Sequence, residues 1–505
     1  MELEIVSKET IKPLSSTPPD LTTLTLSWFD QHTPNVYTPL LYFYTNNNAV
    51  VSSSGCRGRL LKDSLSKALT FYYPFAGRLR DGGNFIDCND MGATFVEAKL
   101  RCPMSEVMNT FDLNHDEILK LLCFEDIKGK VQTFDPLLSV QLTQFECGGE
   151  VMYVSLAHKV ADLATFANFM NDWASIARSS GGIDPPVVCP LFHAASLFRP
   201  ELDGGVDPSE GEGSGSKKRE ENVRSRRMVF EGSKIRALKA MVSKKVENPT
   251  RVQVLTAFIY KAIVSAKNAL SGGLSREPTS ILQFINLRSR VEPPLPGTLT
   301  GNIVSFFRAS STSAEQQREM ELWSVVGDMK RNFEEFCRKL PRNYRDEEGS
   351  PALKSWIKES FETWMMDNDG RKYGCSSWCR FPLYEADFGW GTPIVNFCSV
   401  IALAVWAGQI SQQHLMINLR QRVEPPLPRL IGNIISHCIA LETTGEQREK
   451  EVWDIVGDIK INLKVYCEKF PSDYRDEEWG WLYKLHAKQS MERPKNEGDV
   501  AGDFM

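Results

Sequence analysis

Two kinds of hydrophobic spacing meet in the first half of the chain. In Glu150 to Ala157 the apolar side chains partly alternate with polar ones, which predicts a β-strand with one or both faces covered. The residues that follow show helical spacing. One broad apolar stripe runs through Leu163, Phe166, Ala167, Met170, Trp173, Ala174 and Ala177. Residues 158–162 therefore lie at a predicted strand-to-helix junction, where a side chain can face a cleft while rigid elements hold its backbone.

Similar patterns predict further elements. Residues 64–73 have helical spacing, which ends at Pro74. A second helix is expected to begin at Pro249, with Asn248 as its N-cap. Residues 283–288 are typical of a buried strand. These alternating strands and helices predict an α/β protein.

The composition changes along the chain and suggests its organisation. Residues 1–195 form a first α/β unit, and residues 196–227, rich in Gly, Ser, Glu, Lys and Arg, are expected to be a flexible crossover linker. A second α/β unit is expected over residues 228–408. Residues 409–485 are a partial duplicate of residues 281–355, and residues 486–505 form a tail.

The duplication is visible as repeated phrases. Residues 286–296 (NLRSRVEPPLP) return as residues 418–428 (NLRQRVEPPLP). Two copies are too few for a solenoid, which needs about three repeats to bury its faces. A recent partial duplication, or two neighbouring genes joined in one gene model, explains the pattern. Because the parent segment already fills its own place, we expect the copy to pack loosely at the periphery or to be poorly ordered.

Length and charge limit the possible functions. At 505 residues the chain can bury full cores for two or three domains. Its 59 Lys and Arg nearly balance 64 Asp and Glu, a net charge of −5, so nothing calls for nucleic acid or a membrane surface as partner. No signal peptide is visible at the start. Twelve cysteines without an export signal favour reduced thiols in the cytosol, and we expect a cytoplasmic monomer.

The junction carries the candidate chemistry, His158 and Asp162 in an H-x-x-x-D arrangement. A histidine suits general-base catalysis because its unperturbed pKa of about 6.5 leaves much of it neutral at cytosolic pH. The alternative is structural: His158 is satisfied by neighbouring backbone, and Asp162 caps the following helix. Zinc-protease and P-loop motifs are absent from the sequence, so no metal site is expected. Cys375 and Cys379 lack a second pair and are interpreted as buried thiols.

A second motif favours the catalytic interpretation of the H-x-x-x-D arrangement. Asp387-Phe388-Gly389-Trp390-Gly391 follows about 225 residues further along. Together the two motifs resemble the plant BAHD acyltransferases, which transfer acyl groups from coenzyme A to alcohols or amines. The phrases NPTRVQVLTAFIYKA (248–262) and SWCRFPLYEADFGWG (377–391) resemble the vinorine synthase-like branch, whose members include alkaloid acetyltransferases.

This resemblance implies a two-domain, chloramphenicol acetyltransferase-like α/β fold with an active-site channel between the domains. It implies that acyl-CoA, with acetyl favoured, is a co-substrate, and that no cofactor is bound permanently. The acceptor is expected to be a hydroxyl of a plant specialised metabolite such as an alkaloid. His158 would act as general base in a ternary complex, without an acyl-enzyme intermediate.

The resemblance also assigns roles around His158. Asp162 is expected to be architectural, as is the turn formed by Asp387, Gly389 and Gly391. Asp387 is expected to form an ion pair with an arginine. Arg288 is the first candidate, and Arg420 in the duplicate is its rival.

Two further residues are candidates for stabilising the oxyanion. Trp378 occupies the position credited with this role, and its indole N–H can only donate. Ser376 is a weaker candidate nearby. Core packing is the alternative interpretation for Trp378.

The last part of the sequence suggests a second class of function. Near Asn396 the chain leaves the family pattern, and the duplicate stands where the family's last strands belong. The alternative to an active acyltransferase is therefore a catalytically impaired or inactive relative. A choline- or carnitine-type acyltransferase would share the fold but would not explain the second motif.

Overall fold

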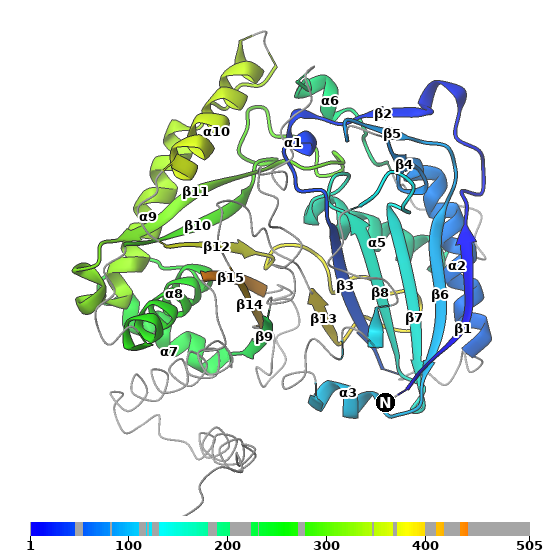
Figure 1. Cartoon of the computed structure of the whole chain (residues 1–505), viewed down its shortest axis with the longest axis horizontal. Coiled ribbons are helices and arrows are strands. Elements are labelled where there is room, and N and C mark those ends of the chain that lie inside the picture. The colour runs from blue at the N-terminus through cyan, green and yellow to red at the C-terminus, as the bar shows by residue number, and fades with distance from the viewer. Residues whose placement is uncertain are drawn as a thin grey trace, which may run out of the picture.

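The computed structural model describes residues 2–45, 54–80, 83–110, 118, 121–123, 131–179, 189–201, 224–230, 232–270, 278–345, 348–366, 371–398, 411–418 and 435–442. In this part of the chain two six-stranded sheets lie side by side, each with helices packed against it (Figure 1). The expected α/β fold with two sheet-based units is confirmed.

The first sheet has the strand order β1-β6-β7-β8-β3-β13. Its strands are β1 (Leu3–Ile11), β6 (Ala93–Leu100), β7 (Leu138–Phe145), β8 (Glu150–Ala157), β3 (Tyr37–Tyr44) and β13 (Val395–Cys398). Neighbours are antiparallel except β6 and β7, which run parallel. A small sheet of β2 (Thr23–Thr25), β5 (Phe85–Asp87) and β4 (Arg78–Leu79) lies beside it.

Strands β3 and β8 are buried at every position, which explains their nearly continuous apolar sequence. Alternate side chains of β3 and β8 pack into different hydrophobic cores. Tyr42 and Val154 face the core that includes α2 (Ser54–Phe71) and α5 (Leu163–Arg178), while Phe43 and Tyr153 face the smaller core of α3 (Met104–Thr110). This period of two places residue 158, just after β8, at the end of a fully enclosed strand.

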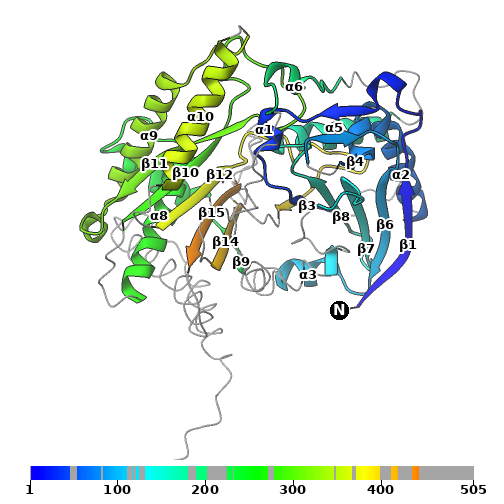
Figure 2. The same ribbon diagram turned by 45° about the horizontal axis from the view of Figure 1, so that its top comes forward.

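The second sheet has the order β11-β10-β12-β15-β14-β9. Its strands are β11 (Val304–Thr312), β10 (Thr279–Asn286), β12 (Arg371–Ser377), β15 (Ile435–Glu442), β14 (Ser411–Asn418) and β9 (Arg224–Val229). The helices of this unit are α7 (Gly232–Ser243), α8 (Arg251–Leu270), α9 (Leu322–Lys339) and α10 (Gly349–Met366). Figure 2 shows α9 and α10 over the β11 side of the sheet.

Helix α8 begins later than the sequence suggested. Asn248 has a positive φ of 46° and lies before the helix, so it is not the cap. Thr250 caps instead: its Oγ1 accepts from the Gln253 N–H at 3.1 Å, and the Gln253 side chain accepts from the Thr250 N–H at 2.9 Å. This reciprocal pair is a capping box, whose T-x-x-Q signature was present in the sequence.

Two strands of the duplicate belong to the second sheet, contrary to the expectation that the copy would pack loosely at the periphery; its other residues lie outside the described part of the chain. Its strands β14 and β15 form an antiparallel hairpin placed between β12 and β9. The hairpin repeats the register of its parent: Asn418 pairs with Ile435 as Asn286 pairs with Val304. The expectation failed because it counted only the parent's partners, whereas β12 and β9 offered unpaired edges to a second hairpin.

The region after β12 returns to the first unit. Trp378, Leu383, Phe388 and Trp390 belong to the hydrophobic core of the first sheet, and β13 pairs antiparallel with β3. This packing differs from the sequence-based division, which assigned all of residues 228–408 to the second unit. The segment after β12 therefore crosses back to the first unit, so the two units are joined by more than a linker.

Candidate active site

His158 lies between β8 and α5, and its backbone is held from two directions. Its N–H donates to the Val36 carbonyl at 2.8 Å, and its own carbonyl accepts from the Asn302 side chain at 2.7 Å. The ring is partly exposed. Nδ1 is buried, and in the described part of the chain nothing reaches it in good hydrogen-bonding geometry.

Burial and the nearby polar groups shift the pKa of His158 in opposite directions. Burial lowers the pKa of His158 below its ordinary value, because the charged form loses hydration. Its own backbone carbonyl, the Asp162 carboxylate and the Asn302 side chain act in the opposite direction. The resulting lowered pKa keeps the imidazole neutral and able to accept a proton.

Asp162 points away from this chemistry and caps α5, as one interpretation of the sequence proposed. Its Oδ1 accepts from the Thr165 N–H at 2.9 Å. Its Oδ2 accepts from the Ile303 N–H at 3.2 Å. The side chain is 4% exposed, and burying a carboxylate without donors and a counter-charge is costly.

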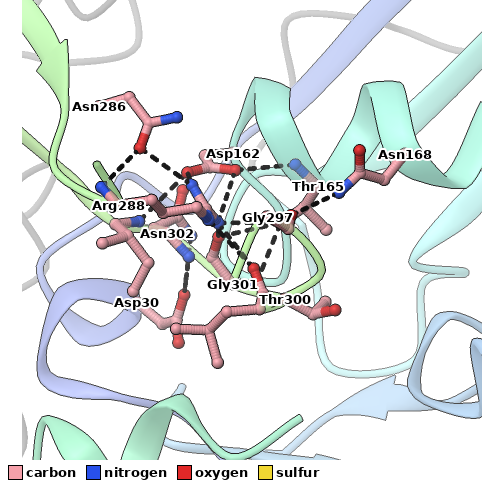
Figure 3. Close-up of polar contacts among 12 residues, drawn as sticks. Asp30, Asp162, Thr165, Asn168, Asn286, Arg288, Gly297, Thr300, Gly301 and Asn302 are labelled. Atoms are coloured by element: carbon pink, nitrogen blue, oxygen red, sulfur yellow. Dashed lines mark hydrogen bonds and ion pairs between the residues drawn. The ribbon is translucent and has the colours of Figure 1, made fainter. Parts of the chain in front are cut away.

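Arg288 supplies that counter-charge from the second unit. Its Nη1 is 2.5 Å from Asp162 Oδ2 and its Nη2 is 3.2 Å from Asp162 Oδ1 (Figure 3). The same guanidinium donates to the carbonyls of Leu299 and Gly301, each at 2.9 Å from Nη2, and to Thr165 Oγ1. A planar guanidinium with five N–H donors suits such a bidentate, buried site.

The expected pair of Arg288 with Asp387 is therefore wrong. Arg288 follows β10 and reaches the start of α5, whereas Asp387 lies in the part of the chain packed on β3. The sequence showed the charges but not these positions. Arg420, the rival partner, lies outside the described residues.

Asp387 instead closes its own turn. Its Oδ1 accepts from the N–H groups of Gly389 at 2.8 Å and Gly391 at 2.9 Å. Both glycines have φ near +108°, which residues with a side chain rarely adopt. The Arg178 side chain donates to the Asp387 carbonyl. Residues 387–391 therefore form a turn that is held by hydrogen bonds within the motif.

The aromatic residues of this turn anchor it to the first sheet. Phe388 and Trp390 stack on each other at 5.7 Å and meet Tyr44 of β3 edge-on. The Arg57 guanidinium lies 5.2 Å from the Trp390 ring and forms a buried ion pair with Glu150 of β8 at 3.0 Å. The motif thus packs on β3, and Arg57 links it to β8, the strand that leads to His158.

The two oxyanion candidates lie together at the end of β12. The Trp378 indole N–H donates to Ser376 Oγ at 3.2 Å, and Trp378 is buried in the core of the first unit. Ser376 is partly exposed. The burial of Trp378 agrees with the packing interpretation, and its role as an oxyanion donor stays a prediction.

Sequence reasoning missed Asp30 and Asn302. Asn302 Nδ2 is 2.9 Å from Asp30 Oδ1, and both residues are almost fully buried. The S-x-x-D pattern of Ser27 and Asp30 predicts a helix cap, which is present. No sequence signal links Asp30 to a residue 272 positions away.

Neither a membrane span nor a metal cluster emerges where the structure is described. No helix there is long and apolar enough to cross a bilayer. The same residues contain no group of three or more His, Cys, Asp or Glu side chains that could hold a metal ion.

Known proteins match most of the chain. A family model described as the Transferase family matches residues 1–402. The 17,18-epoxy-17-hydroxycur-19-ene N-malonyltransferase of Strychnos nux-vomica is 36% identical over 400 residues, which are 78% of this chain and 80% of that protein.

Solved structures show the same architecture. The crystal structure of vinorine synthase, an enzyme of Rauvolfia serpentina, matches with a TM-score of 0.65 at 26% identity, over 90% of this chain and 96% of that one. TRI101 of F. sporotrichioides, complexed with coenzyme A and T-2, matches with a TM-score of 0.56 at 15% identity, over 91% and 98%. The second likeness concerns the fold alone.

Proposed function

Since the chain belongs to the Transferase (BAHD) family of acyl-CoA-dependent acyltransferases, we propose that it transfers an acetyl group from acetyl-CoA to a hydroxyl of an alkaloid-like plant metabolite. His158 is the general base of this reaction. The acetyl donor and hydroxyl acceptor follow from the resemblance to the vinorine synthase-like branch.

The geometry of His158 carries the proposal. A general base must be neutral and held in a fixed place within reach of its proton. His158 meets the first requirement through burial, which lowers its pKa. It meets the second because Val36 of the first unit and Asn302 of the second both bind its backbone.

In the proposed reaction, His158 takes the proton of the acceptor hydroxyl while the oxygen attacks the thioester carbonyl. The tetrahedral oxyanion then collapses, the carbon–sulfur bond breaks, and the imidazolium returns the proton to the departing thiolate. No acyl-enzyme is needed because the thioester is already activated.

The oxyanion needs a hydrogen-bond donor. Ser376 and Trp378 remain the candidates. The Trp378 N–H already donates to Ser376 Oγ, so the serine hydroxyl can turn its own proton toward the oxyanion. In this arrangement Ser376 is the donor and Trp378 orients it.

The partners, cofactor requirement, location and oligomeric state of the enzyme are also proposals. We infer that acyl-CoA and a small acceptor are its partners, that it binds no permanent cofactor, and that it is a cytoplasmic monomer. Eight described cysteines are free thiols, namely Cys88, Cys102, Cys123, Cys147, Cys189, Cys337, Cys375 and Cys379, which suits a reducing compartment.

Replacing His158 with alanine is expected to reduce acyl transfer by about 10²- to 10⁴-fold, because general-base catalysis is lost. Purified protein would be mixed with acetyl-CoA and a panel of plant alkaloid alcohols, and released thiol measured. His193→Ala, which changes an exposed histidine, is the matched control. Near-normal turnover by His158→Ala would contradict the assignment.

The pH dependence of kcat/KM is expected to have its acidic limb below pH 6.5, the ordinary histidine value, since burial lowers the pKa of His158. Protonated His158 cannot accept a proton, so kcat/KM falls as pH falls through that pKa and is full above it. Initial rates between about pH 4.5 and 8.5 test this. A limb centred above 6.5 would exclude His158 as the titrating base.

Two alternatives are separable by the same assay. A relative is named an N-malonyltransferase, so malonyl-CoA and amine acceptors belong in the panel. A catalytically impaired protein would fold cooperatively and yet turn over none of these pairs. The presence of β14 and β15 in the second sheet favours an active enzyme, because the sheet is not left incomplete. The transcript sequence would show whether both copies belong to one message.

A further inference from the structure

One side-chain amide links the second unit to the carbonyl of His158. Asn302 Nδ2 donates to the His158 carbonyl at 2.7 Å and to Asp30 Oδ1 at 2.9 Å. The backbone N–H of Asn302 donates to the same Asp30 oxygen at 2.7 Å. Figure 3 shows the Asn302 side chain directed at Asp30, beside the Asp162–Arg288 pair. Asn302 is 2% exposed, so water does not compete for these bonds.

The Asp30 carboxylate accepts hydrogen bonds from two residues, Ser27 and Asn302. It lies in α1 (Trp28–Gln31), next to the N-cap Ser27. Its Oδ2 accepts from the Ser27 N–H at 2.9 Å and from the Ser27 hydroxyl at 2.6 Å. Together with Asn302, four donors converge on one buried carboxyl group, the pattern of an ionised carboxylate. Burial raises the pKa of Asp30, and these donors act in the opposite direction.

A glycine permits the close approach. Gly301 has a φ of +115°, and a Cβ placed on it would lie 3.2 Å from Asp30 Oδ1. The Gly301 carbonyl meanwhile accepts from Arg288 and Thr165. The turn at residues 301–303 therefore binds both ends of the H-x-x-x-D segment, with Asn302 on the His158 carbonyl and the Ile303 N–H on Asp162.

We propose that Asp30 and Asn302 are positioning residues for His158, a second carboxylate–amide support that works alongside the Asp162–Arg288 pair. This inference rests on the proposed role of His158 as general base. Asn302 holds the His158 carbonyl, a group that also acts on the pKa of the ring. When the acceptor binds, a ring that turns its Nδ1 proton toward that carbonyl has its Nε2 lone pair free to take the acceptor's proton.

The negative charge of Asp30 also supports a positioning role. When His158 accepts a proton, the ring becomes positive, and the Asp30 carboxylate lies next to the Asn302 amide that binds the His158 carbonyl, so its charge acts on the ring through space. Asp162 is paired with Arg288, and the Lys159 ammonium donates to the uncharged Gln31 carbonyl at 2.8 Å. In this proposal the charge of Asp30 adds to that of Asp162, which also acts to raise the pKa of His158.

The test compares Asp30→Asn and Asn302→Ala with Asn171→Ala. Asn171 is the matched control because its amide likewise donates to two acceptors, the carbonyls of Ala167 and Pro382. We expect kcat to fall about 10²-fold in both test variants, as for a misplaced catalytic group, with the KM for acetyl-CoA little changed. In Asp30→Asn the acidic limb of kcat/KM should move to lower pH. Asn171→Ala should keep the wild-type kcat and limb.

Nitrogen-15 spectra of labelled histidine provide a readout besides activity. The His158 signal is identified by its loss in His158→Ala. The wild-type ring should carry its proton on Nδ1, and Asn302→Ala should shift the tautomer toward Nε2–H. A wild-type Nε2–H tautomer would overturn the inference even if Asn302→Ala failed to fold.

The outcomes also separate this inference from the proposed function. If His158→Ala remains active, the proposed function itself fails. If His158→Ala is inactive while Asp30→Asn and Asn302→Ala behave like Asn171→Ala in kcat, pH limb and tautomer, only the positioning role is refuted.

Discussion

Replacing Arg288 with leucine is expected to lower the free energy of unfolding by about 3–5 kcal/mol and to abolish acyl transfer. The substitution leaves the Asp162 carboxylate buried without its counter-charge. It also removes the donor shared by the Leu299 and Gly301 carbonyls. Because Asp162 begins α5, four residues after His158, the loss should also disturb the base.

Urea unfolding of the variant measures this loss. The control is Arg342→Leu, since Arg342 forms an ion pair with Glu292 at 2.7 Å in which both side chains are largely exposed. Such a pair is worth about 0–1 kcal/mol. A double-mutant cycle should show coupling of Arg288 with Asp162 and none with Asp387. A loss no larger than that of Arg342→Leu would show that the buried pair is not needed.

Ending the chain after Gly408 is expected to prevent stable folding of the second unit. The truncation removes β14 and β15, so β12 loses its neighbour on one side. In the described part of the chain β14 is also the strand that pairs with β9. The loss should be on the order of the whole stability of a domain, about 5–15 kcal/mol, because a central part of the sheet is gone.

The control for this truncation ends the chain after Glu442 and keeps both strands. Thermal unfolding and released-thiol activity of the two shortened proteins are compared with those of the full chain. We expect the longer one to retain a cooperative transition and the shorter one to lose it. Equal stability and activity in the chain ending at Gly408 would restore the view that the duplicate is dispensable.

Local features of this protein could be predicted because neighbouring residues determine them. The change from alternating to helical spacing placed His158 at the β8–α5 junction, and a capping residue at the start of an apolar stripe identified Asp162 as an N-cap. The family pattern added the two-unit fold. In each case the evidence lay within one element or its ends.

Contacts between distant elements could not be predicted in the same way. The sequence offered Arg288 and Arg420 as partners of Asp387, and only the course of the chain after β10 brings Arg288 to Asp162 instead. Asn302 carries no signature that distinguishes it from a turn residue, since its partners lie in α1 and after β8. For the duplicate, the repeated phrases were visible in the sequence, but the strand edges that its two strands pair with belong to β12 and β9.

The pairing of β13 with β3 has a consequence for synthesis on the ribosome. The other strands of the first sheet are complete once residue 157 has emerged, but the outer edge of β3 must wait for residue 398. At about 5–20 residues per second, that edge stays open for roughly ten to fifty seconds. Throughout this time a nascent apolar strand can pair with another chain, so chaperone binding to the β3 edge should govern how much active protein a cell obtains.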